Sequence, residues 1–198
     1  MGVTVFFGGT FNPPHLAHRK MLETVCGLPN VERVLVAPTN IPPHKEVAEK
    51  FASKEDRLKM TKLLCKGLDK AIVSDIEFKR TGKSYSFYTL SELKETYPDL
   101  AMLIGGDMVT TFKEWYNYSG ILNLCELFVV RRQGIDNLDF DNSVEELRLE
   151  GGKITVINAD LPDISSTEIR EKSTLCVDIL SLVPENIVEF IKTTGLYR

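Results

Sequence analysis

The chain has 198 residues, of which 43% are hydrophobic and 26% are charged, and its formal net charge is -4. These values are typical of a globular protein, and the length is sufficient for one domain with a sizeable hydrophobic core. The acidic balance excludes a broad basic surface, so we expect no binding to nucleic acid. An anionic ligand must instead be bound by a few placed groups.

The first residues lead into an apolar run without a basic leader, and no apolar run approaches the about 20 residues that cross a bilayer. These features predict a cytoplasmic protein without a membrane partner. The cysteines Cys26, Cys65, Cys125 and Cys176 lie far apart, without the close pairs that bind zinc or exchange disulfides. We therefore expect reduced, mostly buried thiols and no metal site built from protein side chains.

Short apolar runs rich in Val and Ile alternate along the chain with segments of helical periodicity. The runs predicted as strands are residues 3–7, 33–37, 71–76, 100–104, 127–130 and 154–157. The segments predicted as helices are residues 16–26, 54–68, 87–96, 108–115, 144–149, 167–172 and 185–194, and residues 134–152 are predicted as a surface connection that carries the short fifth helix. This alternation predicts an α/β fold: one Rossmann-like, doubly wound domain over residues 1–198, with a mostly parallel sheet and helices on both faces.

Two helix starts have a hydroxyl residue three positions ahead of an acid. Ser53 precedes Asp56 and Ser165 precedes Glu168 at this spacing, which predicts that both serines cap a helix. Pro184 and Gly195 bracket the last predicted helix.

Chemically rich segments follow four of the predicted strands. GGTFNPPHLAH follows the first strand, PTNIPPHK the second, GGDM the fourth, and the residues after the sixth lead to ISSTEIR. Ligands of open parallel sheets bind beyond the carboxyl ends of the strands. We therefore expect these four segments to form one site.

The segment after the first strand is suited to a phosphate group. Gly8-Gly9-Thr10 leaves room for backbone amides to approach a phosphate, although it matches neither a dinucleotide fingerprint nor a P-loop. His15 and His18 lie three residues apart on one face at a helix start, where the helix dipole favours an anion. A metal-binding pair and two ordinary surface histidines are the alternatives, but no third ligand with suitable spacing lies nearby.

This segment fits the pattern G-G-T-F-x-P-x-H-x-x-H, which resembles the signature of the adenylyl- and cytidylyltransferase superfamily. In that superfamily the glycine turn and the histidine pair bind the triphosphate during direct nucleotidyl transfer. Asn12 stands where Asp is frequent in the family, and Ala17 stands where Gly is usual. Neither difference removes a histidine.

Residues 164–170, ISSTEIR, resemble the second signature of the same superfamily, I-S-x-T-x-I-R. The hydroxyl groups and backbone amides lie at a helix start, and Arg170 lies one turn further with a planar guanidinium group that suits phosphate oxygens. An ordinary capped helix with a solvated arginine is the alternative for this segment taken alone.

Further segments resemble the nicotinate-nucleotide adenylyltransferases within that superfamily. They are residues 38–45, 84–90, 105–107, 112–116, 131–134 and 195–198. The resemblance extends from about residue 4 to the last residue and is weakest between residues 135 and 160.

The resemblance implies a role for each matching residue, with His15, His18 and Arg170 as the catalytic residues. The residues implied in ATP binding are Gly8, Gly9, Thr10, Phe11, His15, His18, Gly105, Asp107, Ile164, Ser165, Ser166, Thr167 and Arg170. The residues implied in binding the acceptor nucleotide are Thr39, Asn40, His44, Lys45, Tyr85, Ser86, Trp115 and Arg132.

Some of these residues also have structural interpretations. A lone tryptophan such as Trp115 is often a core residue, and Asp107 fits a simple turn acid. Arg132, and Arg57 as a further weak candidate, fit solvated surface charges.

The implied reaction transfers AMP from ATP to nicotinate mononucleotide, which yields deamido-NAD and pyrophosphate. Mg²⁺ would accompany ATP, held mainly by substrate phosphates and water. The alternatives are a related transferase that uses nicotinamide mononucleotide, phosphopantetheine or a phospho-alcohol as acceptor, a nucleotide-binding protein without turnover, and a metal-binding regulator. The oligomeric state is left open, a homo-oligomer included.

Overall fold

A computed structural model describes residues 2–42, 51–132 and 138–198, without the side chain of Arg132. Its centre is a six-stranded sheet of order β3-β2-β1-β4-β5-β6, in which each pair of neighbouring strands is parallel. The strands are β1 (Val3–Gly9), β2 (Val31–Pro38), β3 (Ala71–Val73), β4 (Leu100–Gly105), β5 (Glu126–Arg132) and β6 (Ile154–Ala159). The predicted α/β fold with a parallel sheet is confirmed.

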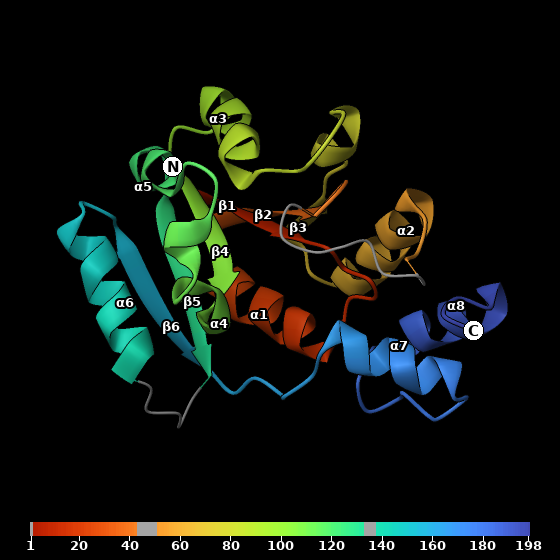
Figure 1. Cartoon of the computed structure of the whole chain (residues 1–198). Helices are drawn as coiled ribbons and strands as arrows, with labels where there is room; N and C mark the ends of the chain where they lie inside the picture. Colours follow the sequence, from red (N-terminus) through yellow and green to blue (C-terminus); the bar gives the residue numbers. More distant parts are fainter. Residues whose placement is uncertain (1, 43–50, 133–137) are drawn as a thin grey trace.

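Helices cover both faces of this sheet (Figure 1). The α-helices are α1 (Leu16–Cys26), α2 (Lys54–Cys65), α3 (Ser86–Thr96), α4 (Gly106–Val109), α5 (Tyr118–Leu124), α6 (Leu138–Leu149), α7 (Ser166–Thr174) and α8 (Glu185–Thr194). Two short 3-10 helices, η1 (Ile76–Lys79) and η2 (Phe112–Glu114), lie in the connections.

Alternate residues of each strand point to opposite faces, and β1 shows the division clearly. Phe7 belongs to a hydrophobic cluster with α1, α2, α7 and α8, whereas Phe6 belongs to a second cluster with α3, α5 and α6. The helices contribute one apolar face each, as in α8, where Ile187, Val188 and Ile191 are buried. The sheet is therefore apolar on both sides, which explains why its strands read as continuous apolar runs.

The strand order reverses direction between β1 and β4. β1 leads through α1 to β2 on one side of the sheet, and β4 leads through α5 to β5 on the other. The chains that leave the carboxyl ends of β1 and β4 therefore diverge, and ligands of such sheets bind in the crevice between them.

The predicted helix ends are confirmed at three positions. Ser53 Oγ accepts a hydrogen bond from the backbone amide of Asp56 at 3.0 Å, and Ser165 Oγ accepts one from that of Glu168 at 3.1 Å. Gly195 ends α8 with a φ of 70°, in the left-handed region that favours glycine.

Several predicted elements differ from the structure. The strand predicted over residues 71–76 ends at Val73, and Ile76 begins η1. The helix predicted over residues 108–115 is divided into α4 and η2, because two β-branched threonines, Thr110 and Thr111, lie between them. α5 was not predicted, although Asn117 caps it by accepting a hydrogen bond from the amide of Gly120 at 3.3 Å. α6 is longer than predicted. Its buried face is formed by Phe140, Val144 and Leu147, whose helical spacing is hard to recognise among the many acidic residues of this segment.

The four cysteines are all free thiols. Cys65 and Cys125 are buried, and burial raises the pKa of each to about 12, so both are protonated at neutral pH. Cys26 is half-buried, whereas Cys176 is exposed. No helix in the described part of the chain is both long enough and apolar enough to span a membrane.

Candidate active site

The β1–α1 loop (residues 10–15) follows two glycines that the structure requires. A Cβ atom on Gly8 would lie 2.9 Å from the Phe6 ring, and one on Gly9 would lie 2.9 Å from the Phe11 ring. Phe11 itself is buried and has a positive φ of 48°. The backbone at this end of β1 therefore carries no side chain that would keep a ligand away.

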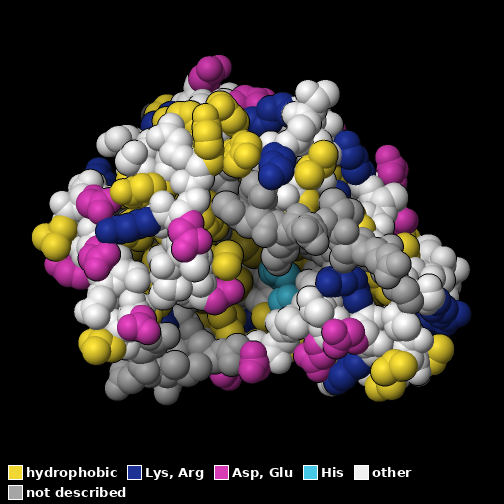
Figure 2. Space-filling view, viewed as in Figure 1, with side chains coloured by type: hydrophobic (Ala, Val, Ile, Leu, Met, Phe, Trp, Pro, Cys, Tyr) yellow, Lys and Arg dark blue, Asp and Glu magenta, His cyan; other side chains and the backbone are white. Residues whose placement is uncertain are grey.

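The two histidine rings lie side by side at the first turn of α1, with centroids 3.7 Å apart. His18 Nδ1 accepts a hydrogen bond from the backbone amide of His15 at 3.2 Å. A neutral imidazole that accepts at Nδ1 carries its proton on Nε2, so the His18 ring presents an N–H donor at that atom. Figure 2 shows histidine side chains in a central hollow of this face, beside basic side chains.

His15 is 7% exposed, and burial lowers its pKa from 6.5 to about 4. Its ring is therefore neutral at pH 7. Within the part of the chain that the structure describes, His15 Nδ1 is buried without a hydrogen-bond partner. The nearby negative charge of a bound anion would raise the pKa of this ring.

The second signature lies against the first. Ser166 Oγ donates a hydrogen bond to the carbonyl oxygen of Pro13 at 2.8 Å, and Arg170 Nη1 donates one to that of Asn12 at 2.9 Å. Arg170 Nη2 also contacts Thr167 Oγ1 at 3.1 Å. These contacts join residues that lie 153 and 158 positions apart in sequence. They meet at Asn12 and Pro13 of the β1–α1 loop, shortly before the histidine pair.

The remaining residues of the second signature surround this contact. Ser165 is exposed and caps α7, Ile164 is half-buried ahead of it, and Thr167 is exposed on the first turn. The start of α7 therefore presents hydroxyl groups and backbone amides beside the β1–α1 loop, an arrangement suited to phosphate oxygens.

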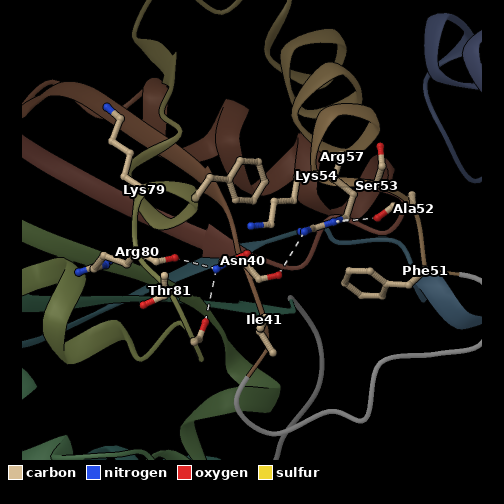
Figure 3. A pocket seen from close by; sticks show the side chains of 12 residues that line it. Asn40, Ile41, Phe51, Ala52, Ser53, Lys54, Arg57, Lys79, Arg80 and Thr81 are labelled. Atoms are coloured by element: carbon tan, nitrogen blue, oxygen red, sulfur yellow. Dashed lines mark hydrogen bonds between the residues drawn. The ribbon is translucent and has the colours of Figure 1, made fainter.

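Arg57 is 1% exposed, so the hypothesis of a solvated surface charge is wrong for this residue. Its guanidinium group donates hydrogen bonds to the carbonyl oxygens of Thr10, Thr39, Asn40 and Ala52. Figure 3 shows the bonds to Asn40 and Ala52. Burial lowers its pKa to about 10, so the group is still charged at neutral pH. The carbonyl dipoles stabilise this charge and hold together the ends of β1 and β2 and the residues before α2.

Aromatic rings complete the environment of Arg57. Its guanidinium carbon lies 4.7 Å from the centroid of the Phe51 ring and 5.3 Å from that of the Phe78 ring. A charged guanidinium group in this position gains a cation–π attraction to each ring. Arg57, a weak candidate from the sequence, is therefore a structural centre of the site.

A pocket of about 610 Å³ opens beyond the carboxyl end of β2 (Figure 3). The described residues that line it include the basic side chains of Lys54, Lys79 and Arg80 and no acid. Asn40 forms one wall, and its Nδ2 donates hydrogen bonds to the carbonyl oxygens of Arg80 at 2.9 Å and Gly82 at 3.4 Å.

The two polar residues at the end of β2 are largely buried. Thr39 is 9% exposed and its backbone amide donates a hydrogen bond to the carbonyl oxygen of Gly9 at 2.8 Å. Asn40 is 5% exposed, and its backbone amide donates one to Ser84 Oγ at 2.9 Å. Both residues therefore shape the backbone of the site, in addition to any contact with a substrate.

The two aromatic residues predicted to bind the acceptor, Tyr85 and Trp115, each pack against a further aromatic ring. Tyr85 is the cap residue of α3, and its ring centroid lies 4.6 Å from that of Tyr116. The Tyr116 hydroxyl contacts the Tyr88 hydroxyl at 2.8 Å. Trp115 is half-buried and its ring lies 5.2 Å from that of Phe112. Tyr116 and Tyr88 had no predicted role, although the position of Tyr116 beside Trp115 in sequence was a signal.

Asp107 lies just beyond the carboxyl end of β4 and is exposed. A Cβ atom on Gly105 would lie 2.5 Å from Asp107 Oδ1, so the carboxylate of Asp107 lies close to the backbone at the end of β4. The placement beside the switch between β1 and β4 fits contact with a ribose and also fits a turn acid.

The structure does not describe the side chains of three residues that were predicted to bind the acceptor. His44 and Lys45 lie outside the described residues, and so does the side chain of Arg132. Among the residues that the structure does describe, no group of three or more His, Cys, Asp and Glu side chains is arranged to bind a metal ion.

The cytidylyltransferase-like family model matches residues 6–172, a range that includes both signatures. Full-length relatives are also similar. A probable nicotinate-nucleotide adenylyltransferase from Fusobacterium nucleatum is 35% identical over 189 residues, covering 94% of this chain and 95% of the relative. One from Geotalea daltonii is 37% identical over 208 residues, covering 96% of each protein.

The chain belongs to the nicotinate-nucleotide adenylyltransferase family, within the cytidylyltransferase-like proteins. The family resemblance of the sequence is thereby confirmed. A member from Escherichia coli is 35% identical over 210 residues and covers 97% of each protein.

Solved structures of this family have the same fold. The nicotinic acid mononucleotide adenylyltransferase of Plasmodium falciparum, complexed with NaAD, superimposes with a TM-score of 0.82 at 18% identity, over 100% of this chain and 98% of that one. A putative nicotinate-nucleotide adenylyltransferase from Vibrio parahaemolyticus gives a TM-score of 0.68 at 21% identity, over 100% and 96% of the two chains. The family fold is therefore retained although the sequences have diverged widely.

The low pKa of His15 predicts a pH dependence of folding. The unfolded chain binds a proton at His15 near pH 6.5, whereas the folded chain does so only near pH 4, so acidification between these values favours unfolding. From pH 7 to pH 5 we expect His15 to lower the free energy of unfolding by about 2 kcal/mol. Urea unfolding of the wild type and of His15→Gln at both pH values measures this effect. Equal pH dependence in the two proteins would contradict the prediction.

Proposed function

We propose that this chain transfers AMP from ATP to nicotinate mononucleotide, releasing pyrophosphate and forming deamido-NAD. The observation that carries the proposal is the contact of the two phosphate-binding signatures, through Ser166 and Arg170, at the β1–α1 loop. This contact lies where a parallel sheet of this order binds ligands. The names of the relatives support the choice of acceptor.

The proposed mechanism requires no protein base. The acceptor phosphate is ionised at neutral pH and attacks the α-phosphorus of ATP in line with the departing pyrophosphate. His18 Nε2–H, the His15 ring and the Arg170 guanidinium group stabilise the charge that develops on the phosphoryl oxygens. His15, neutral in the ligand-free protein, donates one N–H and gains basicity as the anion approaches.

A divalent ion completes the proposed substrate, and we expect Mg²⁺. Bound to ATP, it would neutralise charge on the departing pyrophosphate. The described residues contain no ready-made set of metal ligands, which fits an ion held mainly by phosphates and water.

The start of α3 is the proposed site of the nicotinate carboxylate. The backbone amide of Tyr85 donates to the carbonyl oxygen of Lys83 at 3.2 Å, so the amides that serve the carboxylate begin with Ser86, the first residue of α3. The first amides of a helix point along its axis without an intrahelical partner and favour an anion. A carboxylate would accept these bonds, whereas the NH₂ group of an amide would not.

We propose that the chain acts as one nucleotidyltransferase domain in the cytoplasm, with ATP and nicotinate mononucleotide as its partners. The net charge of -4 supports the absence of a nucleic-acid partner.

The proposed acceptor is tested by pyrophosphate release from ATP or CTP across a panel of acceptors. We expect turnover with ATP and nicotinate mononucleotide, and much less with nicotinamide mononucleotide, because the α3 amides select a carboxylate. Faster turnover with the amide nucleotide or with phosphopantetheine would reassign the acceptor. A folded protein that binds ATP but releases no pyrophosphate with any of them would be a nucleotide-binding protein without turnover.

Replacing His18 by alanine removes one preorganised donor from the proposed phosphate site. We expect kcat to fall on the order of a hundredfold, measured by pyrophosphate release at saturating substrates, with circular dichroism as the test of folding. The matched control is Lys20→Ala, an exposed residue on the same helix, which should leave kcat unchanged. Near-normal kcat in a folded His18→Ala protein would reject the proposed role.

Replacing Trp115 by alanine removes the proposed stacking surface for the pyridine ring. We expect the KM for nicotinate mononucleotide to rise by the equivalent of about 1–3 kcal/mol, while the KM for ATP stays close to that of the wild type. Trp115→Phe keeps an aromatic ring, so its KM for nicotinate mononucleotide should rise less. An unchanged acceptor KM together with a lowered melting temperature would show that Trp115 is a packing residue only.

A further inference from the structure

The C-terminal part of the chain contacts the β1–α1 loop beyond the two signature residues. The backbone amide of Leu16, which follows the loop, donates a hydrogen bond to the carbonyl oxygen of Leu182 at 3.0 Å. The Tyr197 hydroxyl contacts Asn12 Oδ1 at 2.9 Å. Tyr197 is the penultimate residue and lies 185 positions from Asn12.

The side chain of Asn12 is a buried junction between three segments. It is 2% exposed, and its Oδ1 also accepts a hydrogen bond from the backbone amide of Ala52 at 3.0 Å. A backbone amide only donates, so this atom must be the oxygen and the Tyr197 hydroxyl must be its second donor. One oxygen atom thus joins the β1–α1 loop, the residues before α2 and the end of the chain.

Tyr197 is itself held rigidly. It is 5% exposed and belongs to the hydrophobic cluster formed with α1, α2, α7 and α8. Its carbonyl oxygen accepts a hydrogen bond from Thr174 Oγ1 at 2.8 Å, which ties it to the end of α7. Burial raises the pKa of its hydroxyl above the ordinary value, so the hydroxyl remains a donor throughout the neutral range.

We propose that Tyr197 is a positioning residue for ATP binding, which acts through Asn12 to hold the β1–α1 loop in the conformation that presents His15 and His18 to the triphosphate. Among the described residues, the anchors of the loop include Arg57 at Thr10, Tyr197, Arg170 and the Ala52 amide at Asn12, and Ser166 at Pro13. Removing one anchor leaves a buried acceptor with a single donor and loosens the residues directly before the histidine pair.

The proposal also explains why an asparagine is accepted at this position. Both hydrogen bonds end on one oxygen, so a neutral amide satisfies the two donors without bringing a charge into a site that is 2% exposed. An aspartate has an oxygen in the same place and would accept the same two hydrogen bonds. Asn12→Asp is therefore the conservative variant that should keep the contact, whereas Asn12→Ala removes it.

The test measures the affinity for a non-hydrolysable ATP analogue by calorimetry, together with the kinetics of the proposed reaction. Tyr197→Phe keeps the ring and loses only the hydroxyl. We expect its affinity for the analogue and its kcat/KM for ATP to fall on the order of tenfold, and its KM for nicotinate mononucleotide to stay unchanged. Hydrogen exchange at residues 10–15 should become faster.

The partner variants sharpen this result. Asn12→Ala should weaken binding of the analogue at least as much as Tyr197→Phe does, because it also removes the hydrogen bond from the Ala52 amide. The double variant should lose no more affinity than Asn12→Ala, because the interaction with Tyr197 is already absent there. Asn12→Asp should bind the analogue within about twofold of the wild type, because a carboxylate oxygen accepts the same two hydrogen bonds.

A matched control removes a tyrosine hydroxyl elsewhere. Tyr97 packs against the other hydrophobic cluster, and the guanidinium carbon of Arg33 lies 5.4 Å from the centroid of its ring. Tyr97→Phe should bind the analogue like the wild type. Unchanged analogue affinity in Tyr197→Phe, or an equal loss in Tyr97→Phe, would overturn the proposal and leave Tyr197 with a role in stability alone.

The inference rests on the proposed function only in that ATP is the ligand. The binding measurement contains no acceptor. If the wild type binds the analogue but does not use nicotinate mononucleotide, the proposed acceptor is wrong and the test of Tyr197 is still valid. A wild type that does not bind the analogue would overturn both.

Discussion

The hydrogen bonds from Ser166 and Arg170 to the backbone carbonyl oxygens of Pro13 and Asn12 bring the two ends of the site together. Without them the glycine turn and the histidine pair would face an empty crevice, and the start of α7 would be an ordinary capped helix. These bonds end on backbone atoms, so they depend on the course of the loop, which the side chain of Asn12 also helps to hold.

The chain is acidic overall, but basic groups are buried at the site. Two of them, Arg57 and His15, differ in their charge state because their surroundings differ. Arg57 is enclosed by carbonyl dipoles and two aromatic rings, and it remains charged although burial lowers its pKa to about 10. His15 is buried without such partners and is neutral, because burial lowers its pKa to about 4. The arginine is thus a permanent charge of the framework, whereas the histidine is a group whose charge depends on the ligand beside it.

The alternation of apolar runs and amphipathic helices was sufficient to predict the sheet, its parallel strands and the edge at which the chemical groups meet. The cause is local: strands buried on both faces, such as the one containing Phe6 and Phe7, must be apolar throughout. The two signatures were also visible, since each is contiguous in sequence. Their contact was an inference from topology, and the structure brings them together through Arg170.

Other features depend on contacts between distant residues and left no periodic signal. Arg57 reads as one more charge on an amphipathic helix, and only the convergence of four carbonyl groups distinguishes it. Tyr197 lies in a segment that resembles the family, yet nothing in that segment indicates that its hydroxyl reaches Asn12. α5 was missed because its cap, Asn117, adopts a left-handed conformation that is recognisable only in three dimensions.

The 185 positions that separate Tyr197 from Asn12 have a consequence for folding. A contact between residues so far apart in sequence closes a long loop, and the entropy of that closure opposes the contact until other elements have packed. Helices and neighbouring strands form from more local contacts. The β1–α1 loop therefore gains this support only after much of the sheet has assembled, and the nucleotide site becomes ordered late in folding.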